Sequence, residues 1–84
     1  MTIQENWALP MTRIEAYLRS LDEARQIAEV RYAVGGCEVC LQPLEESKVG
    51  SYSFPRTLVT FSGEEEAVAR FHRQFMIRVL PLGG

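Results

Sequence analysis

The chain has 84 residues, of which 46% are hydrophobic and 24% are charged, and its formal net charge is -2. This length fits one small domain spanning residues 1–84, and the composition excludes a largely disordered chain. The negative charge argues against nucleic acid as a partner, because phosphate binding needs clustered cations.

The sequence also predicts no contact with a membrane. It contains no apolar run near the roughly 20 residues that a membrane-spanning helix needs, and no signal-peptide pattern opens it. The prediction is therefore a cytoplasmic protein. Two cysteines are too few to imply a disulfide framework.

Residues 1–9 predict a weak edge strand or an extended arm. Ile3, Trp7 and Leu9 can share one strand face, but Glu5 interrupts the alternation of apolar and polar residues.

Residues 12–28 predict the first helix. Thr12 followed by Glu15 has the capping-box pattern, in which each side chain satisfies a free backbone N–H at the helix start. Apolar residues then recur at steps of three and four and form one stripe. They are Ile14, Tyr17, Leu18, Leu21, Ala24 and Ala28. Ser20 with Glu23 repeats the capping pattern, so a break near residue 20 is an alternative.

Residues 29–42 predict two strands around Gly35-Gly36. Apolar residues alternate with polar ones on both sides of the glycines, which is the period of a half-buried strand. A Gly-Gly pair can adopt the backbone angles of a two-residue hairpin turn, and one strand bent at a glycine bulge is the alternative. Pro43 is expected to end this ladder.

The next two segments are predicted to be a connection and a strand. Residues 43–56 form a long connection of the kind that often carries function. Residues 57–62 are rich in Thr, Val and Phe, which favours a strand.

The chain is expected to finish with a second helix and a last strand. Ser62 followed by Glu65 predicts the start of the helix, whose inner stripe consists of Ala67, Val68, Phe71 and Phe75. Residues 76–80 predict the last strand, and residues 81–84 form a flexible tail.

This order of elements predicts an α+β domain with two helices on one face of a small antiparallel sheet. Without the less certain hairpin the order is βαββαβ, the ferredoxin-like plan, and with it the fold is a close variant. The other face of the sheet must be polar or be covered, and a second copy of the chain is a common cover. A homodimer is therefore predicted.

Cys37 and Cys40 are the residues most suggestive of chemistry. A small zinc or thiol-redox protein is one hypothesis for them. Zinc sites usually have four ligands, however, and the chain has one such cysteine pair and one histidine, His72. Residues three apart on a strand point to opposite faces, so these thiols are expected to fill space, and no metal or cofactor is predicted.

The other polar groups have ordinary interpretations. His72 is read as a surface histidine in the second helix, with no second ligand three or four residues away. Of the two acidic clusters, residues 45–46 are read as part of a solvated loop, and residues 64–66 are read as a helix start favoured by the helix dipole. No catalytic constellation is predicted.

The leading functional hypothesis is therefore a non-enzymatic module for protein–protein interaction or homo-oligomerisation. The types of residue that anchor interfaces gather in the predicted connection, and one more lies in the first strand. The predicted partner-binding residues are Trp7, Tyr52, Phe54, Pro55 and Arg56.

The last residues, Leu80-Pro81-Leu82-Gly83-Gly84, resemble the ends of small sulfur carriers and ubiquitin-like proteins. In those proteins the two glycines let the terminal carboxylate enter a narrow enzyme site and be activated. The resemblance covers only these residues. The β-grasp fold of those proteins opens with a hairpin, for which nine residues before the first helix are too few. A carrier that uses Gly83-Gly84 is the alternative hypothesis.

Overall fold

The computed structural model describes residues 1–78 of the chain. Its elements, in order, are β1 (Thr2–Trp7), α1 (Met11–Ser20), β2 (Ala24–Ala28), β3 (Arg31–Val34), β4 (Cys37–Val49), β5 (Tyr52–Gly63) and α2 (Glu65–Arg78).

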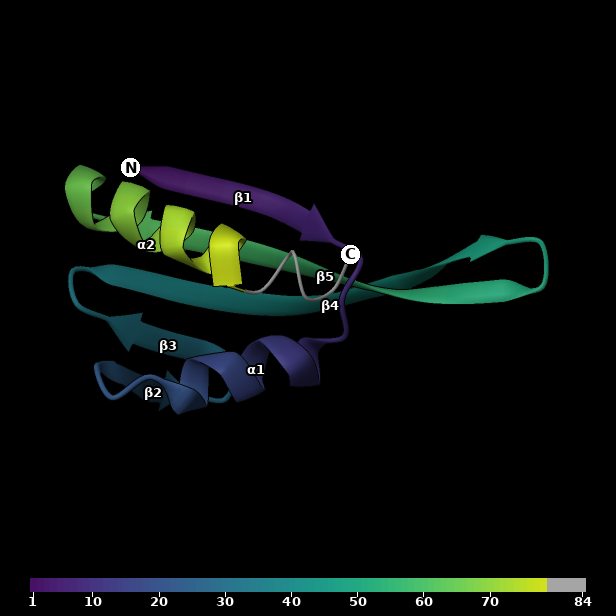
Figure 1. The fold of residues 1–84 in the computed structure, drawn as a ribbon, viewed down its shortest axis with the longest axis horizontal. Coiled ribbons are helices and arrows are strands. Elements are labelled where there is room, and N and C mark those ends of the chain that lie inside the picture. Colours follow the sequence, from purple (N-terminus) through teal and green to yellow (C-terminus); the bar gives the residue numbers. More distant parts are fainter. Residues whose placement is uncertain (79–84) are drawn as a thin grey trace.

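The strands form one antiparallel sheet in the order β1-β5-β4-β3-β2 (Figure 1). Both helices contribute to one buried cluster, through Ile14 and Leu18 of α1 and through Phe71 and Phe75 of α2. The predicted α+β class, with two helices on one face of an antiparallel sheet, is confirmed. The ferredoxin-like order βαββαβ is not confirmed, because four strands lie between the helices of the described region.

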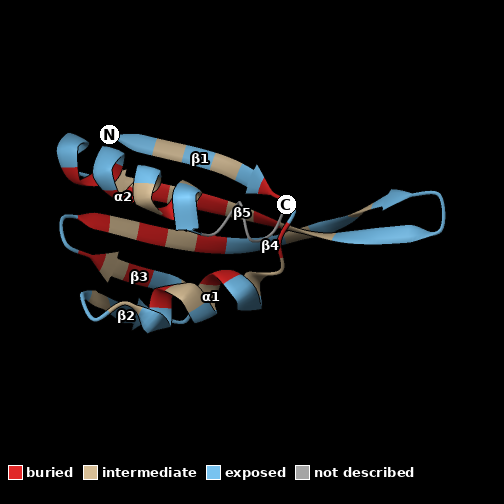
Figure 2. Ribbon diagram, viewed as in Figure 1, coloured by how far each residue is buried: buried red, intermediate tan, exposed pale blue. Residues whose placement is uncertain are grey.

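The two faces of the sheet differ in polarity, as strand alternation requires. In the part of β4 and β5 that lies under the helices, odd-numbered residues such as Val39 and Phe61 are fully buried, and Figure 2 shows both strands as buried there. The even-numbered neighbours Glu38, Thr60 and Ser62 lie on the other face and are only half-buried. The helix-free face is thus largely polar, so it has no need of a covering partner.

Aromatic rings fill the core between α2 and the sheet. The ring of Phe75 lies 4.8 Å from that of Trp7 and 5.5 Å from that of Phe61, measured between centroids. Tyr17 of α1 meets Phe75 edge-on at 5.2 Å, which joins the two helices. These rings together supply most of the large buried surface of a small domain.

The predicted strand at residues 1–9 is confirmed as β1, which pairs with β5 along its whole length. The predicted hairpin around Gly35-Gly36 is also confirmed, since Val34 pairs with Cys37 and Gly35 has a φ of 59°. The alternative of one bent strand is therefore excluded.

The first helix is shorter than predicted, because it ends at Ser20 and residues 24–28 form β2. The Ser20 hydroxyl donates a hydrogen bond to the Tyr17 carbonyl, and Leu21 already has extended backbone angles. The expected capping box is absent. Pro10 is the N-cap and Thr12 lies inside the helix, while Glu15 accepts a hydrogen bond from the Tyr32 hydroxyl at 2.9 Å.

Residues 43–56 were predicted to be a connection, and the structure shows that this is wrong. They continue β4 and β5 into a long two-stranded hairpin, called the arm below, that projects beyond the other strands (Figure 1). Val49 pairs with Tyr52 around a turn in which Gly50 has a φ of 62°. Glu45 and Glu46 form a bulge between the pairs Leu44–Arg56 and Ser47–Phe54.

The predictions for the end of the chain need two corrections. Ser62 does not cap the second helix, because it belongs to β5 and pairs with β1 and β4. Residues 76–78 continue α2 and do not begin a strand, since the apolar spacing of Phe71 and Phe75 extends the helical stripe. Residues 79–84, which include the rest of the predicted strand and the tail, lie outside the described residues.

Candidate functional site

The structure separates the two cysteines. Both lie on β4, where Cys37 is buried in the core and Cys40 is half-buried on the helix-free face. Burial raises the pKa of the Cys37 thiol above its ordinary value, so the thiolate that metal binding requires is disfavoured there. No cluster of three metal-binding side chains occurs within residues 1–78. The pair is thus not assembled for joint chemistry.

A polar group that the sequence analysis missed lies between β1 and α2. The Glu5 carboxylate accepts a hydrogen bond from the Trp7 indole N–H at 3.1 Å and lies 2.8 Å from Nε2 of His72. Glu5 therefore keeps the alternation of β1, with its side chain directed under α2. An acidic residue between Ile3 and Trp7 is the sequence signal that predicts such a buried partner.

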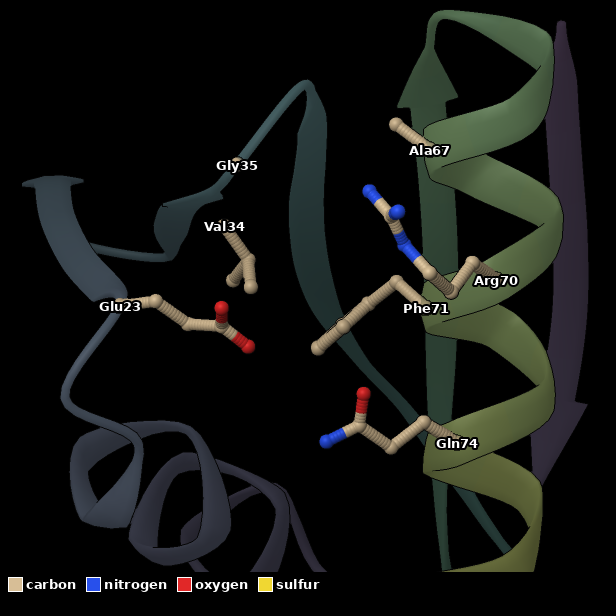
Figure 3. A pocket seen from close by; sticks show the side chains of 7 residues that line it. All are labelled: Glu23, Val34, Gly35, Ala67, Arg70, Phe71 and Gln74. Carbon is tan, nitrogen blue, oxygen red and sulfur yellow. The ribbon is translucent and has the colours of Figure 1, made fainter.

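A cleft of about 370 Å³ opens between α2 and the β3–β4 turn (Figure 3). Glu23 stands on one side, and Arg70 and Gln74 of α2 stand on the other, above a floor that includes Val34 and Phe71. The lining contains no hydroxyl or thiol nucleophile. The cleft is suited to contact with a polar group and carries no catalytic constellation.

The predicted partner-binding residues fall into two groups. Trp7 is only 5% exposed and packs in the core. Tyr52 and Phe54 lie on the arm with 71% and 44% of their surface exposed, and the neighbouring Pro55 and Arg56 are half-buried. The structure thus presents the two aromatic residues of the arm to solvent. Whether any of these residues binds a partner stays a prediction.

The helix α2 runs toward the base of the arm. At its start, Ala67 lies against Gly36 in the β3–β4 turn, at the far end of the sheet. Near its other end, Phe75 packs on Trp7, whose strand partner Thr57 adjoins the arm. The helix α2 therefore runs from the far end of the sheet toward the end from which the arm projects (Figure 1). Gly83-Gly84 lie outside the described residues.

Comparison with known proteins adds what the geometry leaves open. The model of the family described as archaeal MoaD-like protein matches residues 5–84, from the first strand through the final glycines. The chain belongs to the archaeal MoaD-like family. The match to the MoaD-like family thus extends well beyond residues 80–84, which alone resemble the ends of sulfur carriers in the sequence. No curated protein matches the chain.

The MoaD-like chain opens with a single strand before α1, so the described fold lacks the opening hairpin that the β-grasp fold was expected to have. Its long hairpin is the arm, between β4 and β5. No helix in the described part of this MoaD-like chain is long and apolar enough to cross a membrane.

Proposed function

We propose that this protein is a sulfur carrier of the ubiquitin-like kind, whose Gly84 carboxylate is activated and loaded by a partner enzyme. The observation that carries the proposal is the match to the archaeal MoaD-like family over residues 5–84, because that match includes Gly83-Gly84. Two glycines present no side chain, so they fit a narrow site in which backbone and enzyme approach closely.

The chemistry of such a carrier begins with a carboxylate, which is a poor acyl donor. A carboxylate oxygen attacks the α-phosphorus of ATP and releases pyrophosphate, which gives an acyl adenylate. A hydrosulfide sulfur then attacks the acyl carbon, and AMP leaves. With hydrosulfide, the product is a thiocarboxylate at Gly84, and one proton is released.

The folded body supports the role of substrate for that enzyme. Several polar side chains of residues 1–78 contact one another, as Glu5 does His72 and Glu15 does Tyr32. The activating groups are accordingly assigned to the partner. A protein partner agrees with the leading hypothesis from the sequence, whereas self-association and a cytoplasmic location stay predictions.

Mass spectrometry of the intact protein tests the proposal. The adenylating enzyme is purified from the native host by pyrophosphate exchange that depends on this chain, and it is incubated with the chain, ATP and sodium hydrosulfide. The wild-type chain should gain the mass difference between sulfur and oxygen. A chain without Gly83-Gly84 should keep the wild-type circular dichroism spectrum and show no gain.

Lys48→Arg is the matched control, because Lys48 is the only lysine of the chain. This variant should be loaded with sulfur as the wild type is. Loading of the truncated chain, or no loading of the wild type, would refute the proposal. A covalent product that joins the Gly84 carboxyl to a lysine amine of another protein, in place of the thiocarboxylate, would instead identify a protein-conjugating modifier.

A further inference from the structure

The arm has one apolar face. Paired residues of an antiparallel ribbon share a face, and side chains alternate along each strand, so the pair Val49 and Tyr52 lies on the same side as Ser47 and Phe54, two residues further along each strand. Val49, Tyr52 and Phe54 are 64%, 71% and 44% exposed. The pair Lys48 and Ser53 lies on the opposite, polar face. Three large apolar side chains therefore stand together on a narrow projection, which is a common sign of a binding surface.

A proline interrupts each outer edge of the arm near its base, where strand addition is therefore disfavoured. The Leu41 N–H points to the outer edge of β4, where it bonds the Val30 carbonyl, and Pro43, two residues on, faces the same edge. In β5 the Gly63 N–H donates a hydrogen bond to the Met1 carbonyl, on the edge that faces β1. Pro55 lies eight residues earlier, so its nitrogen faces the same edge. Pro43 and Pro55 have no backbone N–H, and each lies beyond the residues that pair with β3 or β1. No hydrogen bond of the sheet is therefore lost at either proline. These prolines favour the apolar face over the edges as the contact surface of the arm.

The size of that face indicates a transient partner and not a stable homodimer. A stable interface buries about 800 Å² on each partner, which three side chains on one face of a two-stranded ribbon do not reach. A sulfur carrier must bind its activating enzyme and leave it again, and a small aromatic contact suits that cycle.

The position of the arm indicates the same partner. Because Phe75 packs on Trp7 beside the base of the arm, α2 runs toward the end of the sheet from which the arm projects. The six residues from 79 to 84 follow Arg78 in the sequence. Six extended residues span at most about 20 Å, so an enzyme that receives Gly84 must come within about that distance of Arg78.

We propose that the arm docks in an apolar groove of the enzyme that activates Gly84, with Tyr52 and Phe54 as anchors. This inference rests on the proposed function. It assigns recognition to the arm and chemistry to the final glycines, so that the two can be disabled separately.

Kinetics with the purified adenylating enzyme tests this separation. Tyr52→Ser combined with Phe54→Ser should raise the KM for the carrier about tenfold or more and leave kcat unchanged, because docking is lost while the tail is intact. Lys48→Ser combined with Ser53→Ala, on the opposite face of the arm, is the matched control and should stay within about twofold of wild type.

A competition experiment gives a second reading. The chain without Gly83-Gly84 cannot be loaded, but it retains the arm and should inhibit loading of the wild type competitively. The same truncated chain with Tyr52→Ser and Phe54→Ser should no longer inhibit. Tyr52 and Phe54 lie in an exposed ribbon, so the circular dichroism spectra of both truncated chains should match that of the wild type.

The possible outcomes are distinct. If the wild type is loaded and the arm variant has an unchanged KM, the docking proposal is wrong while the proposed function stands. If the wild type is never loaded, the proposed function fails and the docking proposal fails with it. A wild-type dimer in sedimentation that the arm variant abolishes would show that the arm binds a second copy, which also overturns the proposal.

Discussion

Phe75 is expected to be the most sensitive position of the core. It is fully buried, and four aromatic rings surround it, with centroids 4.8 Å (Trp7), 5.2 Å (Tyr17), 5.5 Å (Phe61) and 5.7 Å (Phe71) away. Replacing a buried Phe by Ala costs about 3–5 kcal/mol. A domain of this length has a total stability of about 4–13 kcal/mol, at roughly 0.05–0.15 kcal/mol per residue. Phe75→Ala should therefore remove about a quarter or more of the free energy of unfolding.

Urea unfolding measures this loss, and Trp7, the only tryptophan, reports it by fluorescence because its ring touches Phe75. Ile77→Ala is the matched control on the same helix, since Ile77 is 62% exposed, and it should change the free energy of unfolding by less than about 0.5 kcal/mol. A loss below about 1.5 kcal/mol in Phe75→Ala would refute the packing argument, because that value belongs to volume-conserving substitutions.

Further substitutions test other parts of the fold. Glu5→Gln and His72→Ala should show a coupling energy of about 0.5–1.5 kcal/mol in a double-mutant cycle of urea unfolding, and additive effects would mean that the 2.8 Å contact contributes nothing. Burial raises the pKa of the Cys37 thiol in the folded state, so its contribution to stability is complete below the ordinary pKa of about 8.5 and is lost as the pH rises through the folded-state value. Alkaline urea titrations should accordingly show a decline that is shallower in Cys37→Ala, and equal slopes would contradict this. With a thiol reagent, native protein should react first at Cys40, and equal rates would show that Cys37 is accessible. Gly63→Ala should lower Tm by several degrees, because Gly63 has a φ of 137° and a Cβ there would collide with the facing turn; an unchanged Tm would refute the clash.

The alternation of apolar residues predicted the central strands correctly, because β4 and β5 bury their odd residues against the helices. The same reasoning missed the arm. Pro43 and Pro55 look like strand breakers, but each faces a free edge where no ladder hydrogen bond is lost. Strand β2 was also missed. Most of its residues are exposed, so its sequence does not alternate between apolar and polar residues, and its backbone pairing with β3 cannot be seen in the sequence.

The geometry of a candidate site could be predicted from the sequence only where its residues lie on the same strand or helix. The separation of Cys37 and Cys40 follows from strand geometry alone, and the structure agrees. The contact of Glu5 with His72 joins residues 67 positions apart, so it depends on how α2 packs across β1. The final glycines were noticed from the sequence, but their significance needed the family match over residues 5–84.

The arm is joined to the rest of the protein only by the continuation of two strands. A two-stranded ribbon outside a sheet is marginally stable, so its amide hydrogens should exchange with solvent at a lower opening free energy than those of the core. Changes at its tip therefore cost the domain little. Substitutions of the exposed side chains around Gly50 can therefore change the surface of the arm without repacking the interior.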